Sequence, residues 1–415
     1  MKILISLGLF GFYLYFNSRP QLINGQLHRR LEIMLGGYEC LLAAEVSVLA
    51  VLAFYLYLIA FAKLTISLPI LIGNGVFATV FLLILVSNGL IRIFTMSRQN
   101  GLKTYILLAI FWWLPVVNVI LLKKVCRTTV KEYRYELKKS ERNRNRETAQ
   151  VCATKYPILL VHGIFFRDWK AFNYWGRIPK ALIENGATIF YGEQQSTAAV
   201  PVSAAEIRDS ILKIIKETGA EKVNIIAHSK GGIDSRYAIS VLGMDKYVAS
   251  LTTINTPHFG CNYARKLMDK IPDKAVAAIG NKYEKLFTKL GDTEPDFMSG
   301  LVDLTDVACA QLNEIAPNMP NVLYQSIGSQ MKSRSAAGFP LNLGYMIIKP
   351  MEGENDGLVA TTSMPWGNYL GLVTTTGKQG ISHGDVIDLT RKNIDGFDVC
   401  EFYVDLVSKL KRQGF

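Results

Sequence analysis

The stretch Lys222–Gly232 reads KVNIIAHSKGG, and it decides the fold of the chain. Its apolar first half is typical of a short buried strand, and helical periodicity begins shortly after Ser229. A serine at such a strand–turn–helix junction is held on a strained backbone, with its hydroxyl exposed at the carboxyl end of a sheet. Small residues such as Ala227 and Gly231 are needed because strand and helix approach closely there. This is the nucleophile-elbow pattern, with Ala in place of its first Gly.

From Tyr156 onward, apolar runs alternate with amphipathic stretches. The expected strands are Pro157–Val161, Thr188–Tyr191, Val223–Ile226, Ala249–Ile254, Val322–Ser326 and Leu370–Thr374. The expected helices are Trp175–Asn185, Ala204–Thr218 and Gly231–Leu242. Strands that alternate with helices predict an α/β fold with a mostly parallel central sheet and helices on both faces.

Residues 261–318 interrupt this alternation with helical, amphipathic sequence. Between Ala264 and Leu290, apolar residues recur at spacings of three and four among lysines and arginines. Pro272 and Gly280 break the stretch into short helices, which favours a mobile lid over Ser229. The alternative is that the apolar stripe packs on the core.

The first third of the chain is strongly apolar. Residues 64–91 carry no charge, Leu41–Ala62 is apolar except for Glu45, and Thr104–Leu122 is uncharged. Each of these three segments is long enough to cross about 30 Å of hydrocarbon. Ile3–Phe16 is shorter and reads as a membrane segment or a secretory signal. Residues 1–122 are therefore expected to form an all-α transmembrane region of three to four helices.

Residues 123–153 form a basic juxtamembrane linker. The net charge of the chain is +12, and residues 123–146 hold ten Lys/Arg against three Glu, so +7 of that charge lies in this segment. The charge thus indicates a membrane-proximal tract and not a nucleic-acid-binding face. Two interpretations of this basic segment remain: it lies on anionic lipid headgroups, or it is a solvated segment that follows the last membrane span. The Lys/Arg distribution favours a cytoplasmic catalytic domain, and this orientation reverses if Ile3–Phe16 does not span.

A nucleophilic serine needs a base that is itself oriented by an acid. The chain has five histidines, His28, His162, His228, His258 and His383. The first lies in the membrane region, and His228 precedes the serine, where its side chain should point away from the hydroxyl. His162 lies on a strand-to-loop turn, and His258 occupies a position typical of a structural histidine. His383 follows the last strand and precedes a C-terminal helix, which is where the base is expected.

The acid should lie between the serine and the histidine in the chain. Asn355–Val359 reads NDGLV and places Asp356 on a Gly-flanked turn. The order Ser229, Asp356, His383 is the order of nucleophile, acid and base that accompanies an elbow of this kind. The alternatives are a turn-forming role for Asp356 and a capping or core role for His383.

The cysteines Cys40, Cys126, Cys152, Cys261, Cys309 and Cys400 are dispersed, with no CxxC pair. They provide no disulfide framework and no zinc-ligand spacing, and they leave the redox compartment open.

Four segments resemble, in order, the bacterial triacylglycerol lipases of the α/β-hydrolase superfamily. They are YPILLVHGIF (156–165), AHSKGG (227–232), INTPHFG (254–260) and ENDGLV (354–359). The resemblance covers about residues 155–410 and implies an α/β-hydrolase catalytic domain over residues 154–415. It also implies a catalytic triad of Ser229, Asp356 and His383. The implied oxyanion hole consists of the backbone N–H groups of Ile164, with Phe165 as its alternative, and of Lys230.

Some similar lipases carry a calcium ligand two residues after the catalytic histidine, where Asp385 stands here. Residues 335–350, where the second carboxylate would be expected, contain no Asp or Glu. Zinc-binding relatives use an additional His-containing insertion, which the five histidines of this chain do not supply. No metal and no cofactor are therefore expected.

These observations predict a membrane-anchored serine ester hydrolase that cleaves lipid or other acyl esters through an acyl-enzyme on Ser229. Its expected partners are the acyl-ester substrate and the membrane, with no nucleic acid. One alternative is an acyltransferase that uses the same triad with an alcohol or amine acceptor. The other is a catalytically idle membrane scaffold.

Overall fold

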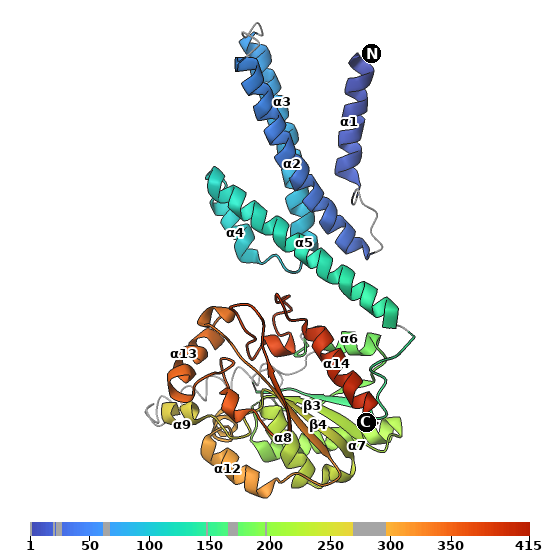
Figure 1. Ribbon diagram of the computed structural model, residues 1–415, viewed down its shortest axis with the longest axis vertical. Coiled ribbons are helices and arrows are strands. Elements are labelled where there is room, and N and C mark those ends of the chain that lie inside the picture. The colour runs from blue at the N-terminus through green and yellow to red at the C-terminus, as the bar shows by residue number, and fades with distance from the viewer. Residues whose placement is uncertain are drawn as a thin grey trace. The chain divides into compact units, whose positions relative to one another are not determined.

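The computed structural model describes residues 2–19, 21, 27–60, 67–146, 148–164, 173–195, 197–268 and 296–415. The chain divides into two compact units, Met1–Asn145 and Arg146–Phe415 (Figure 1). The helices that begin in the first unit are α1 (Lys2–Ser18), α2 (Arg29–Ala60), α3 (Leu68–Met96), α4 (Leu102–Ile110) and α5 (Pro115–Arg146). The helix α5 is thus continuous through most of the expected linker.

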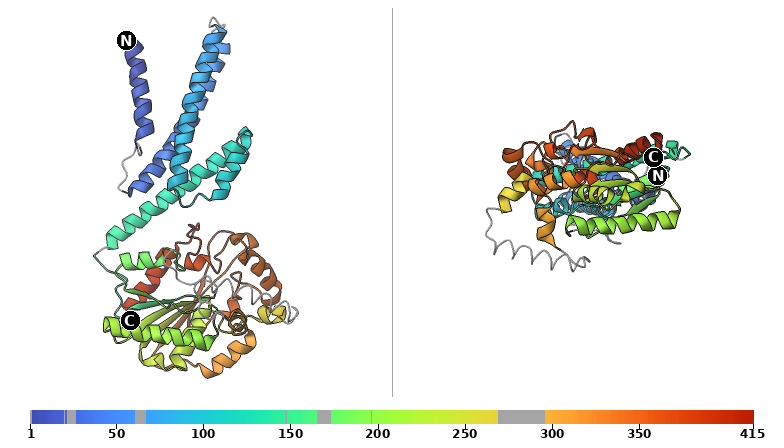
Figure 2. Two further views of the ribbon diagram at one scale, coloured as in Figure 1. Left: turned by 180° about the vertical axis from the view of Figure 1, so that it is seen from behind. Right: turned by 90° about the horizontal axis from the view of Figure 1, so that it is seen from below.

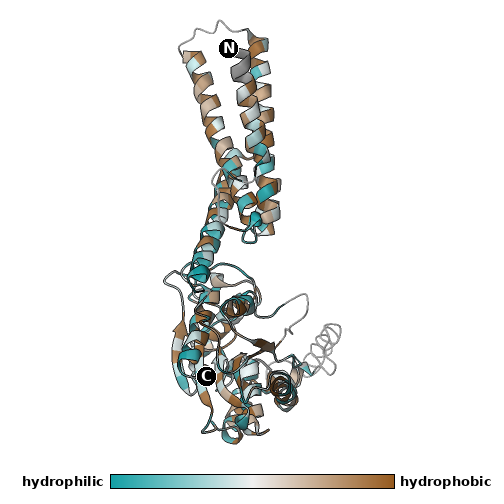
Figure 3. Ribbon diagram, turned by 90° about the vertical axis from the view of Figure 1, so that its right-hand side faces the viewer, coloured by the Kyte–Doolittle hydropathy of each residue, from teal (hydrophilic) through white to brown (hydrophobic). Residues whose placement is uncertain are grey.

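The helices α2 and α3 pack closely against each other at two glycines. A Cβ atom added to Gly37 would lie 2.8 Å from the carbonyl oxygen of Gly89, and one added to Gly89 would lie 2.9 Å from that of Gly37. Both helices carry many large exposed apolar side chains, and hydrophobic residues predominate along their ribbons in Figure 3. Within the described part of the chain, α2 and α3 are the two helices long and apolar enough to cross a membrane.

The expected span Thr104–Leu122 is not one helix, which corrects the sequence-based expectation. The helix α4 ends at Ile110, and α5 begins at Pro115. Proline lacks a backbone N–H and disfavours helical backbone at the residue before it, so the helix is interrupted there. The nine residues of α4 extend only about 14 Å, about half of what a hydrocarbon core requires.

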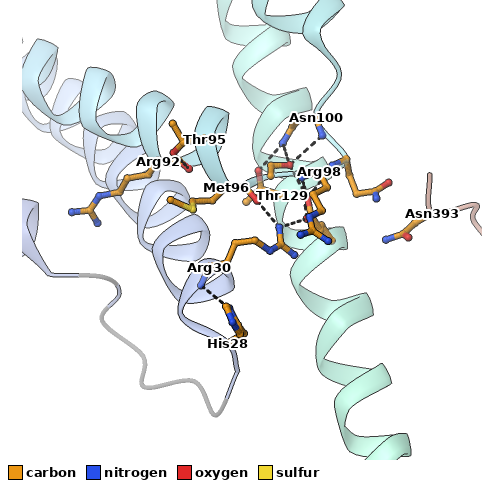
Figure 4. A network of polar contacts seen from close by, with 12 residues as sticks. His28, Arg30, Arg92, Thr95, Met96, Arg98, Asn100, Thr129 and Asn393 are labelled. Atoms are coloured by element: carbon orange, nitrogen blue, oxygen red, sulfur yellow. Dashed lines mark hydrogen bonds and ion pairs between the residues drawn. The ribbon is translucent and has the colours of Figure 1, made fainter. Parts of the chain in front are cut away.

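A buried carboxylate connects three helices of the first unit (Figure 4). Glu132 on α5 is 2% exposed and pairs with Arg30 on α2 at 2.9 Å. It also accepts hydrogen bonds from Ser97 Oγ at 2.7 Å and from the backbone N–H of Arg98 at 3.1 Å, just after α3. The backbone N–H of Gln99 donates to it as well, at 3.2 Å. Since a buried carboxylate is costly without such donors, this network fixes α5 against the ends of α2 and α3.

The second unit contains a six-stranded sheet in the order β2-β1-β3-β4-β5-β6, and every neighbouring pair is parallel. The strands are β1 (Ile158–Val161), β2 (Ile189–Tyr191), β3 (Val223–His228), β4 (Val248–Ile254), β5 (Leu323–Ser329) and β6 (Asn368–Val373). All six strands lie where the sequence predicts them, and the parallel sheet is confirmed.

Helices cover both faces of this sheet (Figures 1 and 2). Side chains that alternate along β1 point to opposite layers: Ile158 and Leu160 belong to one core cluster, and Leu159 and Val161 belong to another. The first cluster includes residues of α6 (Ile178–Glu184) and α14 (Val399–Arg412), and the second includes residues of α7 (Val200–Thr218) and α8 (Lys230–Ser240). The α/β-hydrolase fold expected from the sequence is therefore present.

The segment 261–318 was expected to form a lid. Its described parts contain α9 (Asn262–Met268), α11 (Phe297–Val302) and α12 (Asp306–Ile315), and α13 (Leu341–Glu352) follows β5. Cys309 and Leu312 on α12 are buried in a core cluster with Ile233 of α8. The part around α12 thus packs on the core, as the alternative to a lid expects, and a lid over Ser229 stays a prediction. Residues 269–295, which include most of the apolar stripe, lie outside the described residues.

All six cysteines are free thiols. Five are buried, and Cys126 on α5 is partly exposed. No disulfide therefore links any two cysteines in the structure.

Candidate active site

The elbow at Ser229 is built by the end of β3 and the start of α8. Ser229 has φ +54° and ψ −130°, in a region that non-glycine residues rarely adopt. Strain of this kind costs about 1–3 kcal/mol and persists only where surrounding contacts enforce it. Here the N–H of Ser229 donates to the carbonyl oxygen of Ile254 at 2.9 Å, and Thr256 Oγ1 donates to the carbonyl oxygen of Ser229 at 2.9 Å.

Two glycines allow the chain to approach this serine closely. A Cβ atom at Gly231 would lie 2.3 Å from the carbonyl oxygen of His162, which confirms that a small residue is required there. A Cβ atom at Gly163 would lie 2.8 Å from Cβ of Ser229. The loop after β1 therefore lies directly beside the elbow.

Asp356 and His383 are joined by a short hydrogen bond. Asp356 Oδ2 lies 2.6 Å from His383 Nδ1, and the N–H of His383 donates to the carbonyl oxygen of Asp356 at 2.8 Å. Oδ1 of Asp356 accepts from the N–H groups of Leu358 at 2.9 Å and Val359 at 2.7 Å. Asp356 is fully buried. The carboxylate is therefore fixed and determines the orientation of the imidazole.

This pair lies next to the elbow. The ring centroid of His383 is 4.4 Å from that of His228, the residue before Ser229. Ser229 is 5% exposed and His383 is 6% exposed, so both retain a little access to solvent. The two side chains do not hydrogen-bond to each other; such contacts are often long without substrate and tighten when it binds.

Two backbone N–H groups beside the serine are candidates for anion binding. Lys230 is the first residue of α8, where backbone N–H groups have no partner within the helix. No residue that the structure describes accepts a hydrogen bond from the N–H of Lys230 or of Ile164. The alternative to Ile164, Phe165, lies outside the described residues. The side chain of Lys230 is buried and pairs with Asp234 at 2.7 Å.

The other candidate residues have structural partners. His162 lies within hydrogen-bond distance of two carbonyl oxygens, those of Gly163 at 2.8 Å and Gln194 at 2.9 Å. His258 lies 2.9 Å from Thr253 Oγ1. Asp385 accepts from Ser382 Oγ at 2.7 Å, and burial raises the pKa of its carboxyl group.

Sequence reasoning missed a buried pair that underlies the site. The hydroxyl oxygen of Tyr174 lies 2.6 Å from Nδ1 of His228, and it accepts from the N–H of Gly163 at 3.1 Å. Because that oxygen accepts from Gly163, its own hydrogen is available for His228. Burial, and then the neighbouring His383, lower the pKa of His228 well below 6.5, so the ring that packs against His383 is neutral. Tyr174 belongs to no recognisable motif, but the adjacency of His228 to Ser229 was a signal.

The described part of the chain contains no cluster of side chains suited to binding a metal ion. Among the residues that the structure describes, no three His, Cys, Asp or Glu side chains gather in a way that could hold a metal ion.

Comparison with known proteins places residues 155–255 in the family described as Lipase (class 2). A triacylglycerol lipase of Vibrio cholerae is 31% identical over 243 residues, which cover 52% of this chain and 76% of that protein. A triacylglycerol lipase of Pseudarthrobacter phenanthrenivorans is 32% identical over 179 residues, covering 40% of this chain and 56% of that protein. The chain thus spans about half the length of the latter. Among solved structures, the mature Bacillus licheniformis lipase BlEst2 is 21% identical, with 61% of this chain and 92% of that chain covered and a TM-score of 0.46.

Proposed function

This chain belongs to the class 2 lipase family, and on that basis we propose that it is a membrane-anchored serine ester hydrolase that cleaves acyl esters. Ser229 is the proposed nucleophile, His383 the base and Asp356 the acid. One observation carries the proposal: the hydrogen-bonded pair of Asp356 and His383 lies beside the strained elbow that presents Ser229.

In this mechanism, His383 Nε2 takes the proton of the Ser229 hydroxyl as its oxygen attacks the ester carbonyl carbon. The resulting tetrahedral intermediate collapses, the alcohol leaves with the proton from His383, and the acyl group remains on Ser229. A water molecule then loses a proton to His383 and attacks the acyl carbon. The bond from that carbon to Ser229 Oγ breaks, His383 returns the proton to Oγ, and the acid is released. Asp356 stabilises the imidazolium that forms in each half-reaction.

The negative charge that develops on the carbonyl oxygen needs donors already in place. The backbone N–H groups of Ile164 and Lys230 are the proposed donors. Lys230 follows Ser229 in the chain, Ile164 follows Gly163, which lies against Ser229, and neither N–H has an acceptor among the described residues. A donor aimed at the developing oxyanion contributes about 3–4 kcal/mol to transition-state stabilisation.

Membrane anchoring is proposed through α2 and α3. Both helices are long enough to cross a bilayer. Many of their large apolar side chains are not covered by other parts of the protein. In this proposal neither Ile3–Phe16 nor Thr104–Leu122 spans, so the number of spans stays even and the N-terminus and the catalytic unit remain on the same side of the membrane. The basic residues of α5 favour the cytoplasmic side for that unit.

The test of the nucleophile is labelling of the full chain with a fluorophosphonate, which reacts covalently with activated serines. Wild-type protein and the control variant Ser235→Ala, one turn into α8, should be labelled. Ser229→Ala should not be labelled, and its turnover of a short-chain ester should fall by about 10⁶. Labelling that persists in Ser229→Ala at the wild-type rate would refute the assignment.

A further inference from the structure

The first unit contains a large groove that the proposed hydrolase chemistry does not use. It has a volume of about 710 Å³ and is formed by residues of α2, α3 and α5. The Glu132 network described above, together with a cluster of Leu41, Ile93 and Val125, packs these helices together. The groove is therefore held open by fixed helices and not by a loop.

One part of its lining is apolar and uncovered. Leu42, Val48 and Leu49 of α2 and Val119 of α5 line the groove, and they are 45%, 42%, 62% and 48% exposed. Exposed apolar side chains that adjoin one another indicate a surface that something apolar covers.

The other part of the lining is basic. Lys123, Arg127, Lys131 and Arg134 all line the groove and are all exposed. Their spacings of four, four and three residues place them along one face of α5. Against these four charges stands a single acidic lining residue, Glu45, 4.0 Å from Lys123, with both side chains more than half exposed. Arg127 and Arg134 have no acidic partner in the part of the chain that the structure describes.

The two parts follow one another along α5, because Val119 precedes the basic residues. From Val119 to Arg134 the helix rises about 22 Å, which exceeds the roughly 15 Å of hydrocarbon in one leaflet. The wall is therefore long enough to contact both the acyl chain and the headgroup of one lipid molecule.

We propose that this groove binds one anionic phospholipid, with an acyl chain against α2 and the phosphate against the basic face of α5. Charge complementarity selects this occupant, since Arg127 and Arg134, which have no acidic partner among the described residues, adjoin an apolar surface that a free phosphate ion leaves uncovered. A second copy of this chain is disfavoured, because its equivalent face would bring like charge to the basic row. The proposal is independent of ester hydrolysis.

The test is native mass spectrometry of the full chain in detergent. The protein is titrated with phosphatidylglycerol or with phosphatidylcholine of identical acyl chains. A Ser229→Ala background keeps the added lipid from being hydrolysed, so the result does not depend on the proposed activity. One phosphatidylglycerol should be retained at concentrations where phosphatidylcholine is lost.

Two pairs of variants examine the two parts of the groove. Arg127→Gln with Arg134→Gln should weaken phosphatidylglycerol binding roughly ten- to thirty-fold, since each basic side chain near an anionic headgroup contributes about fivefold. Lys124→Gln with Lys138→Gln removes the same charge from α5 outside the groove and should leave binding unchanged.

Val48→Trp should weaken binding of both lipids by filling the groove, whereas Val46→Trp, on the same helix but outside the groove, should not.

Circular dichroism of each variant verifies that the helices are intact, and Arg127→Lys with Arg134→Lys should bind as wild type does. The proposal is overturned if the two lipids bind equally, or if the control pair weakens binding as much as the groove pair. The proposal is also overturned if native mass spectrometry shows a lipid-free dimer of the chain and Val48→Trp converts that dimer to monomers. In that case a second copy of the chain covers the groove.

Discussion

Both carboxylate oxygens of Asp356 are already engaged, and this limits what can replace it. Oδ1 accepts two backbone N–H groups, and Oδ2 faces Nδ1 of His383. An amide offers only one acceptor oxygen, so an asparagine must turn its NH₂ group toward the backbone donors or toward the imidazole. The first orientation sets donors against donors and loosens the side chain that holds the base, and the second removes the acceptor that faces Nδ1 of His383.

Asp356→Asn is therefore expected to lower kcat for a soluble short-chain ester by about 10⁴ while leaving the fold intact. Asp385→Asn is the matched control, because its carboxylate bonds to Ser382 and not to His383. Its kcat should fall less than about tenfold, since it removes no triad member. Equal losses in the two variants would show that the orienting carboxylate has been misassigned.

Two buried histidines make the stability of the catalytic unit depend on pH. Burial lowers the pKa of His228 and His258 well below 6.5; the neighbouring His383 contributes for the first, and Arg236 for the second. Both rings stay neutral in the folded protein, whereas the unfolded chain binds protons as the pH falls below about 6.5. The unfolded state then holds more protons, so stability is lost toward acid pH.

Each histidine contributes a slope of up to about 1.4 kcal/mol per pH unit below pH 6.5. Denaturant unfolding between pH 7 and pH 5, followed by tryptophan fluorescence, should show the free energy of unfolding decreasing. His258→Asn should reduce the slope because one buried imidazole is gone. An unchanged slope would mean that other groups govern the acid sensitivity.

At the scale of the elements, the sheet was predictable and some helices were not. Every strand is an apolar run between turn residues, and this pattern depends only on local sequence, so all six were located. The interruption between α4 and α5 depends on Pro115, which a count of uncharged residues ignores. The packing of α12 against α8 involves contacts between distant segments, which periodicity cannot distinguish from a lid.

The same holds for the site. Chain order and turn residues predict Ser229, Asp356 and His383 as nucleophile, acid and base, and the structure brings Asp356 and His383 together. The hydrogen bond between Tyr174 and His228 spans 54 residues and involves no motif, so only the folded chain reveals it.

Arg236 of α8 makes polar contacts that fix α12 to α8, in addition to the apolar packing of the two helices. Its guanidinium donates to Asn313 Oδ1 at 2.7 Å and to the carbonyl oxygen of Ala316 at 2.9 Å, and it lies 3.5 Å from the ring centroid of Trp366. Arg236→Met should lower the free energy of unfolding by about 3 kcal/mol, because buried acceptors lose their donor. Arg208→Met, at a partly exposed residue that pairs only with the neighbouring, exposed Asp209, should change it by less than about 0.5 kcal/mol. Denaturant titration of both variants tests this, and similar small losses would contradict it.

At the scale of the whole molecule, the boundary between the units lies at Arg146. Arg146 makes a bidentate ion pair with Glu401 of α14, at 2.8 and 3.0 Å. Cys152 is fully buried in the core beside that helix, and its N–H donates to the carbonyl oxygen of Asn185 at 2.8 Å. The sequence pattern predicts that the catalytic domain starts at residue 154. A domain with that boundary lacks both Arg146 and Cys152 and therefore their contacts.

A fragment Arg146–Phe415 is therefore expected to be soluble, to hydrolyse short-chain esters and to react with a fluorophosphonate. A fragment that starts at Ala153 should be less stable by about 2–4 kcal/mol, because it loses a buried side chain and a bidentate ion pair. Thermal unfolding of the two fragments measures the difference. If neither folds without residues 1–145, the first unit contributes to the catalytic core.

Because the cysteines differ in exposure, the thiol of Cys126 can report chemically on the groove of the first unit. Five cysteines are buried, and Cys126, the partly exposed one, lines the groove of the first unit. An uncharged maleimide should alkylate that sulfur first, without any substitution in the chain. Its rate of modification would then follow occupancy of the groove in intact membranes, where a bound lipid slows the reaction and its departure restores it.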